Sequence, residues 1–363
     1  MDGAAVEPKI HYDCDPCLER SRYQVQAIVH GTKDDPLWQQ VQAAAVQAAM
    51  DMNVQFDMKL NDKYDVSQMV KDINKVTTTD AAAGPDVLIV SIPSVEVQSA
   101  VMDVVNAGIP VVGVNAGSQM GTAVGVLDFV APDDVAGGKL AGETMVLHGA
   151  SSGKFLFVND ELGNIVNVER VTGFKSAFNS TVTVEEFVIE SGISTSAMTS
   201  SIASKLNGCP YQGVLLSGPR TVQAAVSAYA SAGCSISNMP MGSFDTSNSV
   251  FVAIGNDQLT FTIDNQQYLQ GALSTVLASL VATTGKSLAS SAEAKGGAYL
   301  TGPKAVTKST LPSDTVKSCM NEAFPVCPMN KVRIFFGFGF ASFFRVTRIL
   351  ESFMPLNYTG CRA

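Results

Sequence analysis

The stretch "DVLIVSIPSVEVQSAVMDVVNAGIPVVGVNAGS", Asp86 to Ser118, decides the fold. Its beginning, "DVLIVS", is a short run that is apolar on both faces, as expected of a central strand in a parallel sheet. The next segment, "VEVQSAVMDVVNAG", has apolar residues at helical spacing and ends at Gly108, a typical C-cap. A second buried strand, "IPVVGVN", follows and is closed by Asn115. A strand, a helix and a strand in this order predict a parallel unit with a right-handed crossover.

The same alternation extends along the chain in both directions. Before this stretch we expect strands over 23–31 and 54–60, and helices over 34–53 and 66–76. A second set begins near Pro132, with expected helices over 133–149, 169–180, 195–208 and 221–233 and strands over 153–160, 182–190, 213–218 and 239–245. A short strand and a long helix over 258–287 and a strand-like piece over 297–307 complete the pattern. Two sets in tandem predict an α/β protein with two similar lobes.

Composition narrows the possible partners. The chain has 363 residues, of which 46% are hydrophobic and 16% charged, so it can build a sizeable core in two lobes. Its net charge is −9 and it has no long basic run, which argues against nucleic acid as a partner. This composition is more consistent with a neutral or weakly charged ligand than with nucleic acid.

The cysteines suggest an oxidising compartment. Cys14 and Cys17 form a CxxC, but no second pair completes a metal site, so we expect neither a metal nor a cofactor. Cys319 and Cys327 are expected to staple a small loop, and two glycosylation sequons begin at Asn179 and Asn357. Together these features favour a periplasmic or extracellular location.

The two ends of the chain depart from the α/β pattern. Residues 1–22 are polar, look like a leader, and contain no apolar core of a signal peptide. Residues 311–363 form a cysteine-containing tail with the Phe-rich run "IFFGFGFASFF" at 334–344. The run is shorter than the roughly 20 apolar residues that span a membrane. It is a truncated membrane segment, an amphipathic surface helix or a buried arm, and a membrane association through the tail stays open.

Polar residues follow the predicted strands at their carboxyl ends, where doubly wound sheets bind ligands. The candidates from both sets are Asp35, Leu37, Trp38, Ser91, Asn115, Asn164, Asp245 and Asn265. Carboxylates accept hydrogen bonds from adjacent hydroxyls, amides donate and accept, and a tryptophan ring can cover the apolar face of a sugar. This chemistry suits a sugar or polyol. Four of these residues also have a structural alternative: Asp35 as a helix cap, Trp38 as core, and Asp245 and Asn115 as turn residues.

The chain resembles the type I periplasmic solute-binding proteins, in particular the sugar-binding branch with the ribose-binding proteins. The resemblance extends from about Gln24 to Thr307 and rests on the opening stretch together with "GGKLAGE", "ERVTGF", "MGSFD" and "FTIDNQQYLQG". It implies two Rossmann-like lobes joined by a three-segment hinge, with the ligand in the cleft between them. The implied crossovers fall near Asp128–Asp133, Asp245–Asn265 and Tyr299–Pro303. The expected lobes are therefore 23–131 with 266–293, and 132–265 with 294–310.

The resemblance also assigns roles to individual positions. The family's first-loop residues fall on Asp35, Leu37 and Trp38, its polar residue after the fourth strand on Asn115, its carboxylate on Asp245 and its hinge amide on Asn265. Three positions depart from the ribose-binding members: Ala116 and Val168 replace arginines, and Gly218 replaces an asparagine. These departures favour a different polyol, sugar or small polar ligand, or a partly degraded pocket.

Three functions compete. The first is a solute-binding protein for uptake or sensing, with a membrane permease or receptor module as partner; an ectodomain of a membrane receptor with the same lobes is its alternative. The second is a repressor, which needs an N-terminal DNA-binding domain and a basic face. Residues 1–22 are too short for such a domain, and the net charge is acidic. The third is a hydrolase that uses cleft carboxylates such as Asp35 and Asp245, which lacks any other catalytic signature in the sequence. We therefore expect a binding protein and no enzyme.

Overall fold

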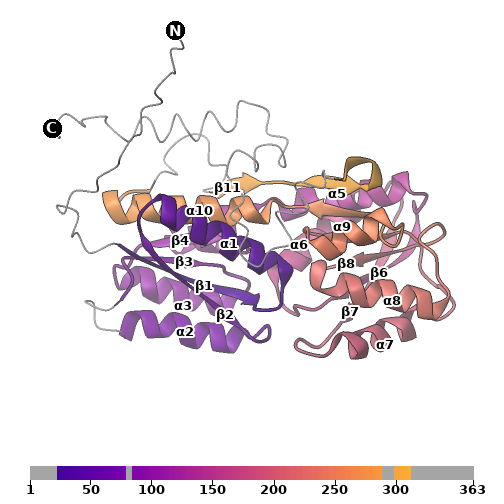
Figure 1. Cartoon of the computed structure of the whole chain (residues 1–363), viewed down its shortest axis with the longest axis horizontal. Helices are drawn as coiled ribbons and strands as arrows, with labels where there is room; N and C mark the ends of the chain where they lie inside the picture. The colour runs from indigo at the N-terminus through magenta and orange to yellow at the C-terminus, as the bar shows by residue number, and fades with distance from the viewer. Residues whose placement is uncertain (1–22, 79–83, 288–297, 312–363) are drawn as a thin grey trace, which may run out of the picture.

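The computed structural model describes residues 23–78, 84–287 and 298–311. Within these residues, the chain forms two six-stranded sheets, each in its own lobe, and the lobes lie side by side along the long axis (Figure 1). The first sheet has the order β11-β5-β4-β3-β1-β2 and the second β12-β10-β9-β8-β6-β7. This is the two-lobed α/β architecture that the alternating pattern predicted.

The first lobe is built from the N-terminal half of the chain and two later segments. Its strands are β1 (Gln24–Thr32), β2 (Gln55–Asn61), β3 (Val87–Val90), β4 (Val111–Val114), β5 (Asp128–Pro132) and β11 (Ala298–Thr301). Its helices are α1 (Pro36–Asp51), α2 (Val66–Thr78), α3 (Val95–Asn106), α4 (Ser118–Ala123) and α10 (Gln267–Thr284). Helices α1 and α10 cover one face of the sheet and α2 and α3 the other (Figure 1). The central strands are therefore buried on both faces, which explains their continuous apolar sequence.

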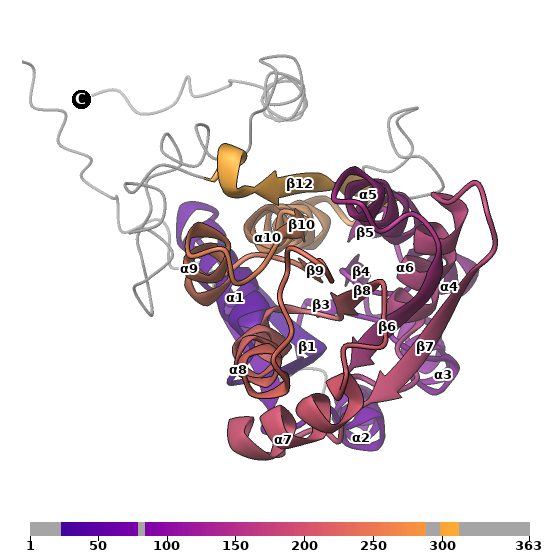
Figure 2. The same cartoon turned by 90° about the vertical axis from the view of Figure 1, so that its right-hand side faces the viewer.

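The second lobe repeats this plan. Its strands are β6 (Gly153–Asn159), β7 (Val182–Val188), β8 (Gly213–Leu216), β9 (Met241–Phe244), β10 (Phe261–Asp264) and β12 (Lys304–Thr307). Its helices are α5 (Asp134–Leu147), α6 (Ile165–Ser176), α7 (Thr195–Leu206), α8 (Val222–Ala232) and α9 (Asn248–Gly255), with short 3₁₀ turns at Pro219–Thr221 and Lys308–Thr310. Viewed along the long axis of the molecule, its helices lie on both faces of the sheet (Figure 2). One core cluster packs under α7, α8 and α9 and another under α5 and α6.

The chain passes between the lobes three times, and the structure corrects where. Residues 128–132, expected in the first crossover, form β5 and pair with β4 and β11, so the chain crosses only after Pro132. Most of the expected second crossover, 245–265, stays in the second lobe as α9 and β10, and the chain leaves after Asp264.

The third crossover also corrects the lobe boundary. We assigned 294–310 to the second lobe, but β11 pairs in parallel with β5 of the first sheet. Only β12 belongs to the second sheet, where it pairs antiparallel to β10. The chain therefore changes lobe at Gly302 and Pro303. The pairing of β11 with β5 joins strands more than 150 residues apart, which local sequence patterns do not encode.

Helices α5 and α6 pack closely because glycines face backbone atoms across their interface. A Cβ on Gly173 would lie 1.9 Å from the carbonyl oxygen of Val135, and a Cβ on Gly138 would lie 2.0 Å from that of Arg170. No side chain fits at either position. The close approach helps to position the α6 side chains against the start of α5.

Cys209 and Cys234 form a disulfide that the sequence analysis did not predict. Cys209 follows α7 and Cys234 follows α8, so the bond ties the ends of two neighbouring helices. The expected leader, the Phe-rich run and the cysteines at 14, 17, 319 and 327 lie outside the described residues. Among the described helices, none is both long enough and apolar enough to cross a membrane.

Candidate functional site

The two lobes touch along the boundary where the carboxyl ends of their strands face each other. Tyr64 N donates to Ser191 Oγ at 2.9 Å, and Ile165 N donates to the carbonyl of Pro93 at 3.0 Å. Gln40 Nε2 of α1 also donates to the carbonyl of Thr246 in the second lobe. The loops that carry the predicted site residues are thus closed over one another.

A buried histidine at the end of β1 joins three of the predicted residues. His30 Nδ1 lies 2.8 Å from Ser91 Oγ, and its Nε2 lies 3.3 Å from Asn164 Nδ2 of the other lobe. Its ring packs edge-on against Trp38, with ring centroids 4.9 Å apart. Burial, with a smaller contribution from Arg170, lowers the pKa of His30 to about 3. The imidazole is therefore neutral, and donation from Asn164 to Nε2 suits the tautomer with its proton on Nδ1.

A buried arginine organises the second lobe's side of the boundary. Arg170 of α6 donates from Nε to Asp134 at 2.8 Å and from Nη1 to the carbonyl of Ser217 at 2.7 Å. Its Nη2 lies 3.4 Å from Asp245 Oδ2, and its guanidinium lies 4.2 Å from the centre of the Phe244 ring. Burial raises the pKa of Asp134 to about 7, and Arg170 opposes that rise. Burial also raises the pKa of Asp245, again opposed by Arg170.

A chain of amides runs from the first lobe to the hinge. Asn115 Nδ2 donates to Gln270 Oε1 at 3.0 Å, and Gln270 Nε2 donates to the carbonyl of Asn265 at 2.8 Å. The side chain of Asn265 lies close enough to Asp245 to lower the pKa of that carboxyl group. It makes no hydrogen bond of ordinary geometry with it. Both its Nδ2 and its Oδ1 are buried and have no partner in the described part of the chain. Such atoms are costly to bury, so they mark a place where a ligand can bind.

Acidic residues from both lobes complete the site. Asp35 caps α1 by accepting from Leu37 N at 2.9 Å, as its structural alternative predicted. Burial raises the pKa of Asp35 well above its usual value, and Glu161 raises it further. Glu161 follows β6, accepts from Asn164 Nδ2 at 2.7 Å, and has its pKa raised to about 7 by burial and by Asp160. Glu161 of the second lobe is thus close enough to Asp35 of the first lobe for its charge to raise the pKa of Asp35.

The predicted site residues are all buried. The histidine contacts bring together Trp38, Ser91 and Asn164, and the amide chain links Asn115 to the hinge. Two of them also belong to the first lobe's core: Leu37 and Trp38 pack in one apolar cluster, and the Trp38 ring lies directly against Gly31. Whether these residues bind ligand stays a prediction.

Several residues of this boundary were not selected from the sequence. Arg170 lies in the "ERVTGF" stretch and Glu161 directly follows a strand, so both had a signal that was not used. Gln270 lies in the "FTIDNQQYLQG" stretch and had the same kind of signal, whereas Asp134 is the first residue of α5, where an acidic residue is ordinary, and gave none. Their role depends on contacts with residues far away in sequence.

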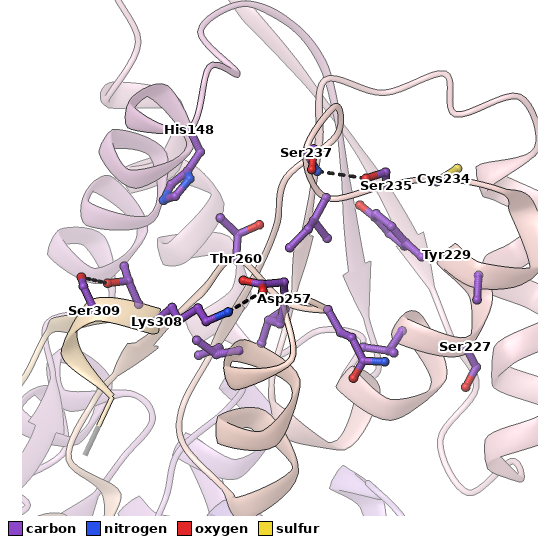
Figure 3. A pocket seen from close by; sticks show the side chains of 17 residues that line it. His148, Ser227, Tyr229, Cys234, Ser235, Ser237, Asp257, Thr260, Lys308 and Ser309 are labelled. Carbon is purple, nitrogen blue, oxygen red and sulfur yellow. Dashed lines mark hydrogen bonds and ion pairs between the residues drawn. The ribbon is translucent and has the colours of Figure 1, made fainter. Parts of the chain in front are cut away.

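A separate cavity of about 870 Å³ lies in the second lobe, away from the boundary (Figure 3). It is lined by residues that include His148, Tyr229, Cys234, Asp257 and Lys308, and by none of the predicted site residues. Among the described residues, no group of three or more His, Cys, Asp or Glu side chains could hold a metal ion.

Comparisons with known proteins agree with this architecture. The sequence profile of the periplasmic binding protein domain matches residues 27–287. A search of curated proteins found no significant match.

Solved structures of similar fold cover most of the chain. A carbohydrate transporter from Acidothermus cellulolyticus 11B in complex with myo-inositol is 26% identical, with a TM-score of 0.73 over 84% of this chain and 99% of that one. An ABC transporter solute-binding protein from Agrobacterium vitis bound with α-D-tagatopyranose is 20% identical, with a TM-score of 0.68 over 82% and 98%. GanP, a glucose-galactose binding protein from Geobacillus stearothermophilus, is 16% identical, with a TM-score of 0.68 over 81% and 100%. With the profile matching most of the chain, the protein belongs to the periplasmic binding protein domain family, as its resemblance predicted.

Proposed function

We propose that the protein is a solute-binding protein that captures a small sugar or polyol between its lobes, for uptake or sensing. The observation that carries this proposal is the convergence of buried polar side chains from both lobes at the carboxyl ends of their strands. Asn115 and His30 come from the first lobe, and Asn164 and Asp245 from the second. Binding between the lobes couples ligand capture to closure.

The chemistry of these side chains suits hydroxyl groups. The side-chain amide of Asn265, the Tyr64 hydroxyl and Gln267 Oε1 provide donors and acceptors that are buried and have no hydrogen-bond partner among the residues that the structure describes. A hydroxyl both donates and accepts, so a polyol can satisfy such mixed groups at once. Similar proteins are solved with myo-inositol and with tagatopyranose, which supports this ligand class.

Closure follows from contacts that form only when the lobes meet. The ligand stabilises the closed state by the additional hydrogen bonds it makes there, beyond those it makes to one open lobe. The Asn164–His30 and Gln40–Thr246 contacts belong to that closed state. Binding rather than catalysis is the proposed activity, because Asp35 caps α1 and Asp134 and Asp245 lie beside Arg170.

The departures from ribose-binding relatives point to a different ligand. Ala116 and Val168 stand where the ribose-binding members have arginines, so neither position supplies a guanidinium group to the ligand. Ala116 is buried at the end of a strand of the first lobe, and Val168 is 59% exposed on α6. Gly218 places no side chain after β8. A hexose or a cyclitol is therefore a better candidate than ribose.

Location and partners follow from the same proposal. The Cys209–Cys234 disulfide and the family membership support a periplasmic or extracellular site of action. A membrane permease or a receptor module is the proposed partner, and a receptor ectodomain remains the alternative form of the same binding function.

The test is a ligand screen on the purified chain. Thermal unfolding is measured with myo-inositol, hexoses, pentoses and nucleosides, and hits are titrated by calorimetry. We expect saturable binding of at least one sugar or polyol and a change in the fluorescence of Trp38, the only tryptophan. Absence of binding across the sugars and polyols would contradict the proposal.

A further inference from the structure

Carboxylates outnumber cationic groups at the interlobe boundary. The carboxylates are Asp34, Asp35, Asp134, Asp160, Glu161 and Asp245, and the cations that pair with them are Arg170 and Arg220. His30 adds no charge because its imidazole is neutral. A neutral sugar carries no charge that would offset this excess.

Arg220 neutralises the outer part of the cluster. Its Nη1 lies 3.0 Å from Asp160 of the second lobe, and its Nε lies 3.4 Å from Asp34 of the first. Asp160 also accepts from Ser217 Oγ at 2.6 Å. Arg170 is engaged with Asp134 and the carbonyl of Ser217 and lies beside Asp245. Both guanidinium groups are therefore committed to other carboxylates.

Within the described part of the chain, Asp35 and Glu161 form no ion pair with a lysine or arginine, and we call them the facing acidic pair. Asp35 accepts one backbone N–H, from Leu37. Glu161 accepts from the Asn164 amide, and the neutral His30 ring lies 3.9 Å from it. The two belong to different lobes, and each directly follows the outer carboxylate that Arg220 holds in place. Burial raises the pKa of both carboxyl groups; Glu161 raises that of Asp35 further, and Asp160 raises that of Glu161 further.

An independent observation indicates that a ligand belongs beside this pair. Asn265 is 1% exposed, its side chain lies near Asp245, and neither its Nδ2 nor its Oδ1 has a partner among the described residues. Asp245 lies 3.4 Å from Arg170, which donates to the carbonyl of Ser217. Ser217 Oγ in turn donates to Asp160, the residue before Glu161, so a ligand at this amide lies on the same part of the boundary as the pair.

We propose that the ligand is a polyhydroxylated cation, an amino-substituted sugar or cyclitol whose ammonium group lies between Asp35 and Glu161. The inference rests on the proposed function and narrows its ligand class. An ammonium group donates hydrogen bonds to carboxylates and supplies a positive charge beside two groups that form no ion pair with a lysine or arginine among the described residues. Because the pair comes together only when the lobes meet, the cation is bound more tightly by the closed state than by the open one. Anionic sugars are disfavoured for the same reason.

The test compares ligands that share a ring and differ in charge. Glucosamine, glucose and glucuronate form one series, and amino-substituted inositol with myo-inositol forms another. Dissociation constants are measured by calorimetry on the full chain near neutral pH. We expect the amino ligand of at least one series to bind at least about tenfold more tightly than its neutral counterpart, and glucuronate not to bind.

Charge-neutralising variants test the assigned residues. Glu161→Gln keeps the shape of the side chain, and Asp35→Asn keeps a residue that caps helices well. Each is expected to abolish most of the preference for the amino ligand. Asp62→Asn is the matched control, because it also removes one carboxylate but lies on the surface beside Lys33. This control is expected to keep the preference.

The outcomes separate the inference from the proposed function. Binding of neutral sugars without a preference for the amino ligand overturns the inference and leaves the proposed function standing. A preference that survives both Glu161→Gln and Asp35→Asn also overturns it. Absence of binding by all the sugars and cyclitols overturns both.

Discussion

Replacing Arg170 by methionine tests the buried charge network that organises the second lobe. The side chains of Arg170, Asp134 and Asp245 are 5%, 3% and 1% exposed, so the network is desolvated. Removing the cation leaves two buried carboxylates without their counter-charge, which typically costs about 3–5 kcal/mol of folding free energy. The contact with the Phe244 ring, worth about 1 kcal/mol, is partly replaced by the methionine thioether. We expect the Arg170→Met protein to be about 3–5 kcal/mol less stable near pH 8.

The cost should shrink in acid. The folded-state pKa of Asp134 is about 7, above its ordinary value of 3.8, so the folded state favours the protonated carboxyl. The stability linked to this group is fully present below about pH 4 and is lost as the pH rises through about 7. Without Arg170 the pKa of Asp134 rises further, and the loss at high pH becomes larger. The difference between wild type and variant is therefore smaller at pH 5 than at pH 8.

Urea unfolding followed by circular dichroism at both pH values measures this difference. Lys205→Met is the matched control, because Lys205 also pairs with a carboxylate, Glu185, and lies over the Phe187 ring, but its side chain is 40% exposed. An exposed pair of this kind contributes about 0–1 kcal/mol. A cost below 1 kcal/mol for Arg170→Met, or an equal cost at pH 5 and pH 8, would refute the reasoning.

Three further predictions concern binding, packing and the disulfide. Asp245→Asn keeps a residue that tolerates the positive φ of 63° but removes a charged acceptor, so ligand affinity measured by calorimetry should fall by about 1.5–3 kcal/mol. Gly173→Ala places a methyl group 1.9 Å from the Val135 carbonyl and should lower the free energy of unfolding by about 1–3 kcal/mol. Replacing Cys209 and Cys234 by serine opens a bridge between residues 25 apart and should cost about 3 kcal/mol in urea unfolding.

Each of these predictions has its own control. For Asp245→Asn, unchanged affinity would remove this residue from the site. Gly218→Ala is the control for Gly173→Ala, because its Cβ would meet nothing within 4 Å and its φ is −172°; equal stability of the two variants would contradict the packing argument. For the disulfide, the oxidised wild type should lose the same stability on reduction, and no loss would show that the bond does not stabilise the fold.

Much of the fold could be predicted from local sequence. Buried parallel strands are apolar on both faces, and helices repeat every 3.6 residues, so runs such as "DVLIV" and "VEVQSAVMDVVNAG" identify their own structure. Strand ends in such sheets converge, which is why Ser91 and Asn164 could be expected near one another before any coordinates. They meet at His30.

The parts that could not be predicted depend on contacts between distant segments. Strand β11 belongs to the first sheet because it pairs with β5, about 170 residues earlier, and no local pattern distinguishes that partner from β10. The pairing of Cys209 with Cys234 likewise depends on the packing of α7 against α8.

The sequence by itself therefore determined that this protein has two α/β lobes and which loops face the boundary between them, because periodicity and strand polarity are local properties. Only the tertiary structure decided which charges are paired. Arg220 holds Asp34 and Asp160, and Arg170 holds Asp134 beside Asp245. Asp35 and Glu161 form no ion pair with a lysine or arginine of the described segments, because pairing depends on distances between side chains that the folded chain alone brings together.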